Sequence, residues 1–239
     1  MTYQAELFND NRPNVGVTVV PFVYKDNKIQ VLLYKRASNA EVFSGDWALP
    51  NIFFDRQIHN NLDEAVFGAL NEKTNIKIPH FEQLGVYAGL YIDPDRITTI
   101  NVGYIALLRE DEVKHISALD PFETRWVAVE DLGDTQLAFN HNEVLNDAYK
   151  RLCYKAGYSS SVFHLLPDHF TISELREMLE LLLDVKLDNS RFRDRIKKSG
   201  VLSEVKGKTK AANHRPAQVY KVNSKYEGDF YPKSLTKPS

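Results

Sequence analysis

The acidic side chains of one predicted helix are the first candidates for metal chemistry in this 239-residue chain. Apolar residues at helical spacing predict a helix from Leu62 to Glu72. Magnesium prefers several oxygen ligands, and such an ion can activate water. Lys73, however, follows Glu72 and places a positive charge where a second ligand would be needed. Asp63 and Glu64 lie two turns earlier, where they complement the helix dipole. We therefore predict no bound metal, no cofactor and no catalytic residue.

The segment around this helix resembles a Nudix box, the motif whose clustered carboxylates bind magnesium for pyrophosphate cleavage. The full pattern is G-x5-E-x7-R-E-U-x-E-E-x-G-U, where U is bulky and apolar. Aligned back from Ile76, only Leu70, Glu72 and Ile76 keep this pattern. If Leu49-Pro50 is instead matched to the family's Leu-Pro-Gly-Gly, then Asn51-Ile52 replaces both glycines. Glu72 is the only remnant of the metal site, so we predict that the domain does not hydrolyse pyrophosphates.

Basic side chains gather near the other end of the chain. Between Arg191 and Arg215 there are nine Lys or Arg residues and two acidic ones. Residues 1–162 carry 15 basic and 22 acidic side chains, a net charge of −7, whereas residues 163–222 carry 12 and 8, a net charge of +4. This asymmetry predicts that only the C-terminal part binds a polyanion.

The residues around this basic cluster are typical of a winged helix-turn-helix. Thr171-Ile172-Ser173-Glu174 predicts the start of one helix, and Asp188 or Asn189 predicts the start of a second. On the second helix Phe192 and Ile196 share one face, which leaves the basic side chains on the other. A recognition helix needs this arrangement, with apolar residues behind and hydrogen-bond donors toward the bases.

The predicted second helix and wing supply the DNA contacts. Arg191 and Arg193 are candidates for guanine contacts because a guanidinium can span O6 and N7, while Lys197 and Lys198 suit phosphates. Residues 201–205 and 218–222 predict two short strands around a flexible cationic wing loop. The predicted DNA-binding residues are Thr171, Ser173, Asn189, Ser190, Arg191, Arg193, Lys197, Lys198, Lys206, Lys208, Lys210, His214 and Arg215.

The rest of the chain mixes strands and helices. Residues 15–24 and 29–35 predict a hairpin, and residues 137–154 predict a helix. Further strands are predicted at residues 83–91, 98–108 and 125–129. This order predicts an α+β fold. We divide it into an effector-binding domain at residues 1–155, a winged helix-turn-helix at 160–223 and a flexible tail at 224–239.

Composition limits the compartment. Cys153 is the only cysteine, so no intrachain disulfide forms, which fits a reducing environment. The first residues lack the layout of a signal peptide, and no apolar run reaches the length of a membrane span. We expect a cytoplasmic protein that does not associate with a membrane.

Several segments, in order along residues 15–222, resemble the NrtR-type transcriptional regulators, which join a Nudix-like effector domain to a winged helix. They are residues 31–36, 45–50, 93–96, 125–127, 137–141 and 165–175, and most specifically His214-Arg215-Pro216-Ala217-Gln218-Val219-Tyr220. The resemblance implies a Nudix-like α/β/α sandwich with a mixed sheet and a homodimer on a palindromic double-stranded DNA operator. It also implies a small-molecule effector, either ADP-ribose or a related NAD metabolite, or a sugar. Segments that line the cleft of Nudix folds contain the candidate effector-binding residues Arg36, Trp47, Phe54, Tyr91, Asp93 and Arg96.

Our main interpretation is a bacterial transcriptional regulator that responds to a ligand without hydrolysing it. One alternative is an active Nudix hydrolase of nucleoside diphosphate derivatives with an accessory C-terminal module, which Glu72 favours. Another is a non-catalytic module whose basic region binds RNA or a protein. The affinity of such a module for nucleic acid would depend on salt but not on sequence.

Overall fold

A computed structural model describes residues 13–74, 80–88, 99–113, 123–211 and 216–226. The chain forms two compact units. The first comprises Met1–Pro21, Val31–Ala106 and His115–Ala148, and the second comprises Phe22–Gln30, Leu107–Lys114 and Tyr149–Ser239. The second unit therefore includes the turn of the N-terminal hairpin, which the sequence patterns did not indicate. Within the described ranges no helix has the length and apolar character that crossing a membrane requires.

A seven-stranded sheet dominates the N-terminal part of the described residues. Its strands are β1 (Asn14–Lys25), β2 (Lys28–Lys35), β3 (Trp47–Ala48), β4 (Asn51–Phe53), β5 (His80–Ala88), β6 (Thr99–Leu108) and β7 (Thr124–Ala128). The order is β3-β2-β1-β6-β5, with β4 also paired to β1 and β7 to β2. Most of β1 is buried in an unbroken run, as expected for a central strand covered on both faces.

Helices α1 (Leu62–Thr74) and α3 (His141–Ala156) accompany this sheet, together with the short α2 (Glu110–Val113) and the 3₁₀ turn η3 (Val129–Asp131). The predicted helix at residues 137–154 therefore begins four residues late. Phe139 has a positive φ of 56°, and the Ala138 N–H donates to the Trp47 carbonyl at 2.8 Å. These contacts hold residues 137–140 in a bent turn.

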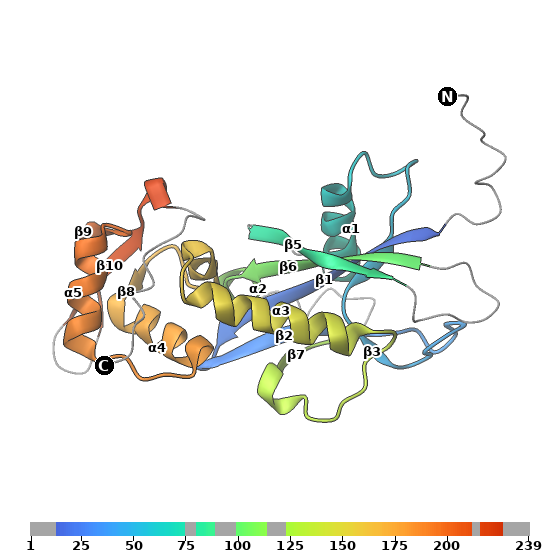
Figure 1. Cartoon of the computed structure of the whole chain (residues 1–239), viewed down its shortest axis with the longest axis horizontal. Helices are drawn as coiled ribbons and strands as arrows, with labels where there is room; N and C mark the ends of the chain where they lie inside the picture. Colours follow the sequence, from blue (N-terminus) through green and yellow to red (C-terminus); the bar gives the residue numbers. More distant parts are fainter. Residues whose placement is uncertain (1–12, 75–79, 89–98, 114–122, 212–215, 227–239) are drawn as a thin grey trace. The chain divides into compact units, whose positions relative to one another are not determined.

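The C-terminal part contains α4 (Ile172–Leu183), α5 (Asn189–Ser199) and a three-stranded sheet in the order β8 (Phe170–Thr171), β10 (Ala217–Val222), β9 (Leu202–Lys210). Two 3₁₀ turns, η4 (Ser160–Leu165) and η5 (Ser224–Tyr226), flank these elements. Figure 1 shows α5 beside β9, in agreement with their contacts. Leu175 and Leu179 of α4 and Phe192 and Ile196 of α5 are buried together in this small core.

Two predictions of local structure were wrong in this part. Residues 206–210, predicted as a flexible wing loop, belong to β9, in which Thr209 and Lys210 pair with Gln218 and Ala217 of β10. Residues 224–226, placed in a flexible tail, form η5, in which the Tyr226 N–H donates to the Asn223 carbonyl at 2.8 Å. The remaining tail, residues 227–239, lies outside the described residues.

Candidate functional site

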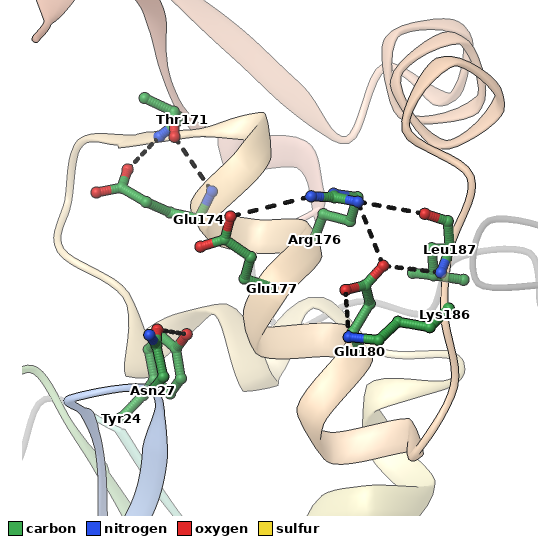
Figure 2. Close-up of polar contacts among 9 residues, drawn as sticks. All are labelled: Tyr24, Asn27, Thr171, Glu174, Arg176, Glu177, Glu180, Lys186 and Leu187. Atoms are coloured by element: carbon green, nitrogen blue, oxygen red, sulfur yellow. Dashed lines mark hydrogen bonds and ion pairs between the residues drawn. The ribbon is translucent and has the colours of Figure 1, made fainter. Parts of the chain in front are cut away.

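A reciprocal cap begins α4. The Thr171 hydroxyl accepts a hydrogen bond from the Glu174 N–H at 3.1 Å, and the Thr171 N–H donates to Glu174 Oε2 at 2.6 Å (Figure 2). This arrangement satisfies two backbone donors at the helix end. Thr171 is buried and occupied by the cap, whereas Ser173 is exposed. Of these two predicted DNA contacts, Ser173 is the one whose side chain faces solvent.

The same glutamate holds a lysine of the wing. Lys210 Nζ lies 2.9 Å from Glu174 Oε1 and 3.2 Å from Oε2. Burial raises the pKa of the Glu174 carboxyl, but hydrogen bonds from Lys210 and Thr171 outweigh burial and bring the pKa below its ordinary value. The ion pair therefore joins the end of β9 to the start of α4 and engages Lys210 within the fold.

Helix α5 presents the predicted polar face. Asp188 caps its start, with Oδ1 accepting from the Arg191 N–H at 2.8 Å, and Gly200 ends it at a positive φ of 72°. Phe192 and Ile196 are buried on the inner face. The predicted DNA-binding residues of this helix are all exposed: Asn189, Ser190, Arg191, Arg193, Lys197 and Lys198. Asp194 is exposed as well. The predicted division of the helix into two faces is confirmed, and contact of the outer face with DNA stays a prediction.

The wing presents two lysines on a braced hairpin. Lys206 and Lys208 are exposed on β9, on either side of Gly207, whose φ of 75° few other residues tolerate. The side-chain amide of Gln218 donates to the Val205 carbonyl at 3.0 Å and the Lys208 carbonyl at 3.3 Å, across an irregular stretch of β10. Sequence reasoning gave Gln218 no role, since only the fold reveals its partners. His214 and Arg215 lie outside the described residues.

In the effector domain, the half-buried ring of Trp47 is stacked against a cation that the sequence analysis did not single out. Arg125 Cζ lies 3.9 Å from the ring centroid, and Lys35 Nζ lies 5.8 Å from it. Lys35 also forms an ion pair with Glu123 at 2.9 Å. Arg125 thus covers one face of the ring, as a cation–π contact does.

The other predicted effector residues are dispersed among local contacts. Arg36 donates twice to the Val42 carbonyl, at 3.2 and 3.0 Å, and its guanidinium lies 4.7 Å from the centre of the Phe139 ring. Phe54 stacks on the buried His59, with the ring centroids 5.9 Å apart. The predicted residues Tyr91, Asp93 and Arg96 lie outside the described residues.

Asn51 and Ile52, which stand where the Nudix pattern has glycines, belong to β4 and pair with β1. The Tyr34 hydroxyl donates to Asn51 Oδ1 at 2.8 Å, and the Leu49 N–H donates to His141 Nδ1 at 3.0 Å. Both partners lie far away in the sequence. The segment from Leu49 to Asn51 is therefore held by side chains of β2 and α3, and His141 has a structural role as a hydrogen-bond acceptor.

Glu64, a carboxylate in the first turn of α1, is engaged in local hydrogen bonds. Glu64 accepts from the Asn60 N–H at 2.8 Å and from its amide at 3.0 Å, and these hydrogen bonds lower the pKa of the Glu64 carboxyl. Glu64 is thus engaged at the start of α1, where Asn61 Oδ1 also accepts from the Glu64 N–H at 2.9 Å, while the side chain of Glu72 lies outside the described part. Among the described side chains, no three His, Cys, Asp or Glu residues gather around one point.

The winged helix and the sheet both have counterparts in known proteins. Residues 162–222 match the NrtR DNA-binding winged helix domain. A protein of Acinetobacter baylyi named ADPR responsive transcriptional repressor NtrR is 31% identical over 231 residues, which cover 95% of this chain and 88% of that protein. This chain belongs to the NrtR family.

Solved structures of a second NrtR protein agree with this assignment. Shewanella oneidensis NrtR complexed with a 27mer DNA is 30% identical, with 91% of this chain and 99% of that chain covered and a TM-score of 0.79. The NUDIX domain of the same protein, complexed with ADP ribose, is 28% identical, with 63% and 94% covered and a TM-score of 0.53. The predicted α+β fold, a Nudix-like domain followed by a winged helix, is confirmed.

In an NrtR-family winged helix, the wing lysines should differ in their effect on DNA binding. We expect Lys208→Ala to make the negative slope of log affinity against log salt concentration shallower by about 1, because an exposed lysine that binds a phosphate releases one counterion. Lys210→Ala should change this slope much less, since Glu174 already neutralises Lys210. Fluorescence anisotropy over a salt series measures both slopes, with Lys206→Ala as a second exposed case. Equal changes of slope for Lys208→Ala and Lys210→Ala would contradict the conclusion that Glu174 neutralises Lys210.

His141 should make the NrtR fold sensitive to acid. Burial lowers the pKa of His141 to about 3, and the nearby charge of Arg36 acts in the same direction. Between pH 6.5 and about 3, the unfolded chain binds a proton that the folded chain excludes. The stabilisation is complete above pH 6.5 and falls as the pH drops, by as much as about 1.4 kcal/mol per pH unit.

Urea denaturation of the wild-type chain and His141→Gln at several pH values tests this expectation. Glutamine can accept from the Leu49 N–H but does not titrate, so its unfolding free energy should fall less steeply on acidification. Other carboxylates titrate in both proteins, and the difference between the two curves isolates His141. Parallel curves would show that His141 is protonated in the folded chain.

Proposed function

We propose that this chain is an ADP-ribose-responsive transcriptional repressor that binds operator DNA through α5 and the β9–β10 wing. The observation that carries the proposal is the outer face of α5, where six neutral polar or basic side chains and the acidic Asp194 are exposed opposite a buried apolar face. This face lies in a segment that matches the NrtR DNA-binding winged helix domain. Exposed arginines near the start of a recognition helix suit base edges, and lysines further along suit phosphates.

Within this proposal, the residues that contact DNA directly are the predicted ones whose side chains are exposed. Arg191 and Arg193 would contact base edges, while the phosphate contacts would come from Ser173, Asn189, Ser190, Lys197, Lys198, Lys206 and Lys208. His214 and Arg215 continue the wing in sequence and keep their predicted roles. Thr171 and Lys210 support the interface from within, through the cap and the ion pair with Glu174.

The effector proposal rests on relatives and on one feature of the chain. The Acinetobacter relative is named as responsive to ADPR, and the NUDIX domain of the Shewanella relative was crystallised with ADP ribose. Trp47 and Arg125 place a ring and a guanidinium in contact on the effector domain, and such a pair suits a nucleotide that carries both a base and phosphates. We therefore add Arg125 to the effector-binding candidates Arg36, Trp47, Phe54, Tyr91, Asp93 and Arg96.

The proposed regulator acts in the cytoplasm as a homodimer. Two copies of α5 related by a two-fold axis would reach half-sites about one DNA turn, roughly 34–36 Å, apart and read a palindrome. ADP-ribose would favour a dimer geometry that does not match this spacing and would release the operator. Light scattering during gel filtration measures the assembly.

The decisive experiment is a mobility shift with the DNA upstream of the chain's own operon, without and with ADP-ribose. We expect a sequence-specific complex that ADP-ribose dissociates, while a sugar such as arabinose leaves it unchanged. Release by arabinose and not by ADP-ribose would overturn the effector proposal. Equal affinity for a scrambled duplex would instead favour a sequence-blind nucleic-acid or protein-binding module.

The same preparation tests the hydrolase alternative. Glu72 is the remnant that favours it, but the carboxylate of Glu64 is hydrogen-bonded to Asn60 at the start of α1. We expect no AMP or ribose phosphate from ADP-ribose in the presence of magnesium. Product formation that Glu72→Gln abolishes would establish a hydrolase and contradict our proposal.

A further inference from the structure

The turn between α4 and α5 is held by a side chain of α4. Glu180 Oε1 accepts a hydrogen bond from the Leu187 N–H at 2.8 Å (Figure 2). Arg176, one helical turn earlier, lies 3.4 Å from Glu180 Oε1 and donates to the Leu187 carbonyl, also at 3.4 Å. Glu180 and Arg176 therefore form hydrogen bonds with the backbone N–H and the backbone carbonyl of Leu187. The shorter bond, from the Leu187 N–H to Glu180, is the stronger contact.

These groups are shielded from water. The Glu180 side chain is 9% exposed, the Arg176 side chain 23% and Leu187 4%. A buried N–H without a partner is costly, so the Leu187 peptide remains where Glu180 can accept from it. Lys186 also lies 3.6 Å from Glu180, but its side chain is 94% exposed and holds the turn weakly.

Glu180 connects the end of one helix to the start of the next. Its backbone carbonyl accepts from the Val185 N–H at 3.2 Å, just after α4 ends, and its side chain binds Leu187, two residues further on. The next residue, Asp188, caps α5. The position of the first turn of α5, which carries Arg191, is therefore set from α4 through Leu187.

We propose that Glu180 is a positioning residue for the recognition helix, and that it acts through its hydrogen bond to Leu187 rather than through its charge. The inference rests on the proposed binding of operator DNA by α5. Hydrogen bonds to base edges depend on donor direction and distance, whereas phosphate contacts are carried mainly by charge. A shift of α5 should therefore weaken sequence-specific binding more than binding to arbitrary DNA.

Two substitutions separate reach from charge. Glu180→Gln keeps the length and the acceptor oxygen but loses the negative charge, while Glu180→Asp keeps the charge but is one methylene too short to reach Leu187. Glu177→Asp is the matched control, because Glu177 is half-exposed on the same helix and its contact with Arg176 is long, at 3.9 Å. Affinity is measured by anisotropy for a duplex that the wild-type chain selects from a random-sequence library, and for a scrambled duplex. All measurements are made below the melting temperature of each variant.

We expect Glu180→Asp to lose about tenfold in affinity for the selected duplex, a change of about 1.4 kcal/mol, with little change for the scrambled duplex. Glu180→Gln and Glu177→Asp should stay close to wild type on both. Impaired Glu180→Gln beside normal Glu180→Asp would show that the charge matters and overturn the inference, as would equal losses on both duplexes. If the wild-type chain selects no duplex at all, the proposed DNA-binding function itself fails.

Discussion

Replacing both Arg191 and Arg193 with alanine should abolish sequence-specific DNA binding while leaving the fold intact. Both side chains are exposed on α5, and Phe192 between them holds the helix from the other face. A bidentate arginine–guanine pair contributes about 1–3 kcal/mol of discrimination, so the double variant should bind the operator about 100-fold more weakly. Mobility shifts with operator and scrambled duplexes give the ratio of the two affinities.

The ratio distinguishes reading of bases from general attraction to DNA. If the arginines read bases, affinity for the operator falls toward affinity for the scrambled duplex. Arg151→Ala, which removes an exposed arginine from α3, is the control for loss of positive charge and should change neither affinity much. An unchanged affinity ratio in the double variant would show that another element reads the sequence. Calorimetric titration with ADP-ribose checks that the effector domain remains folded.

Phe192→Ala should strongly destabilise the winged helix. Phe192 is 1% exposed and lies on the inner face of α5, which packs against α4 and β9. Truncation of a buried phenylalanine costs about 3–5 kcal/mol because the lost contacts leave a cavity. A small helix-turn-helix depends on few such contacts, so this variant should also lose operator binding at temperatures where the wild-type chain binds.

Chemical denaturation followed by circular dichroism measures this effect. Phe192→Leu is the matched control, since a smaller apolar side chain retains part of the packing and should cost roughly 1.5 kcal/mol or less. Operator affinity should follow stability in the two variants. A stable Phe192→Ala chain would contradict the packing role of this residue.

The sequence alone determined the features of this protein that depend on local periodicity. The spacing of Phe192 and Ile196 fixed the buried face of α5, because residues three or four apart share one side of a helix. Thr171 and Glu174 predicted the start of α4 for a similar reason, since a capping box joins residues three apart. The missing carboxylates of the Nudix box were equally visible, because that motif is defined by spacing within one segment.

The tertiary structure decided which side chains are engaged and which are available. In the sequence Lys210 is one cation among several, yet in the fold Glu174, 36 residues earlier, holds it. Leu49 likewise finds its partner in His141, 92 residues later. The contacts of Gln218 and Arg125 likewise join separate strands. Local sequence patterns carry no information about such pairs, because each depends on how distant segments pack. The sequence therefore determined the kind of surface on α5, whereas the fold determined which residues of α4, β9 and the effector domain hold or surround the sites.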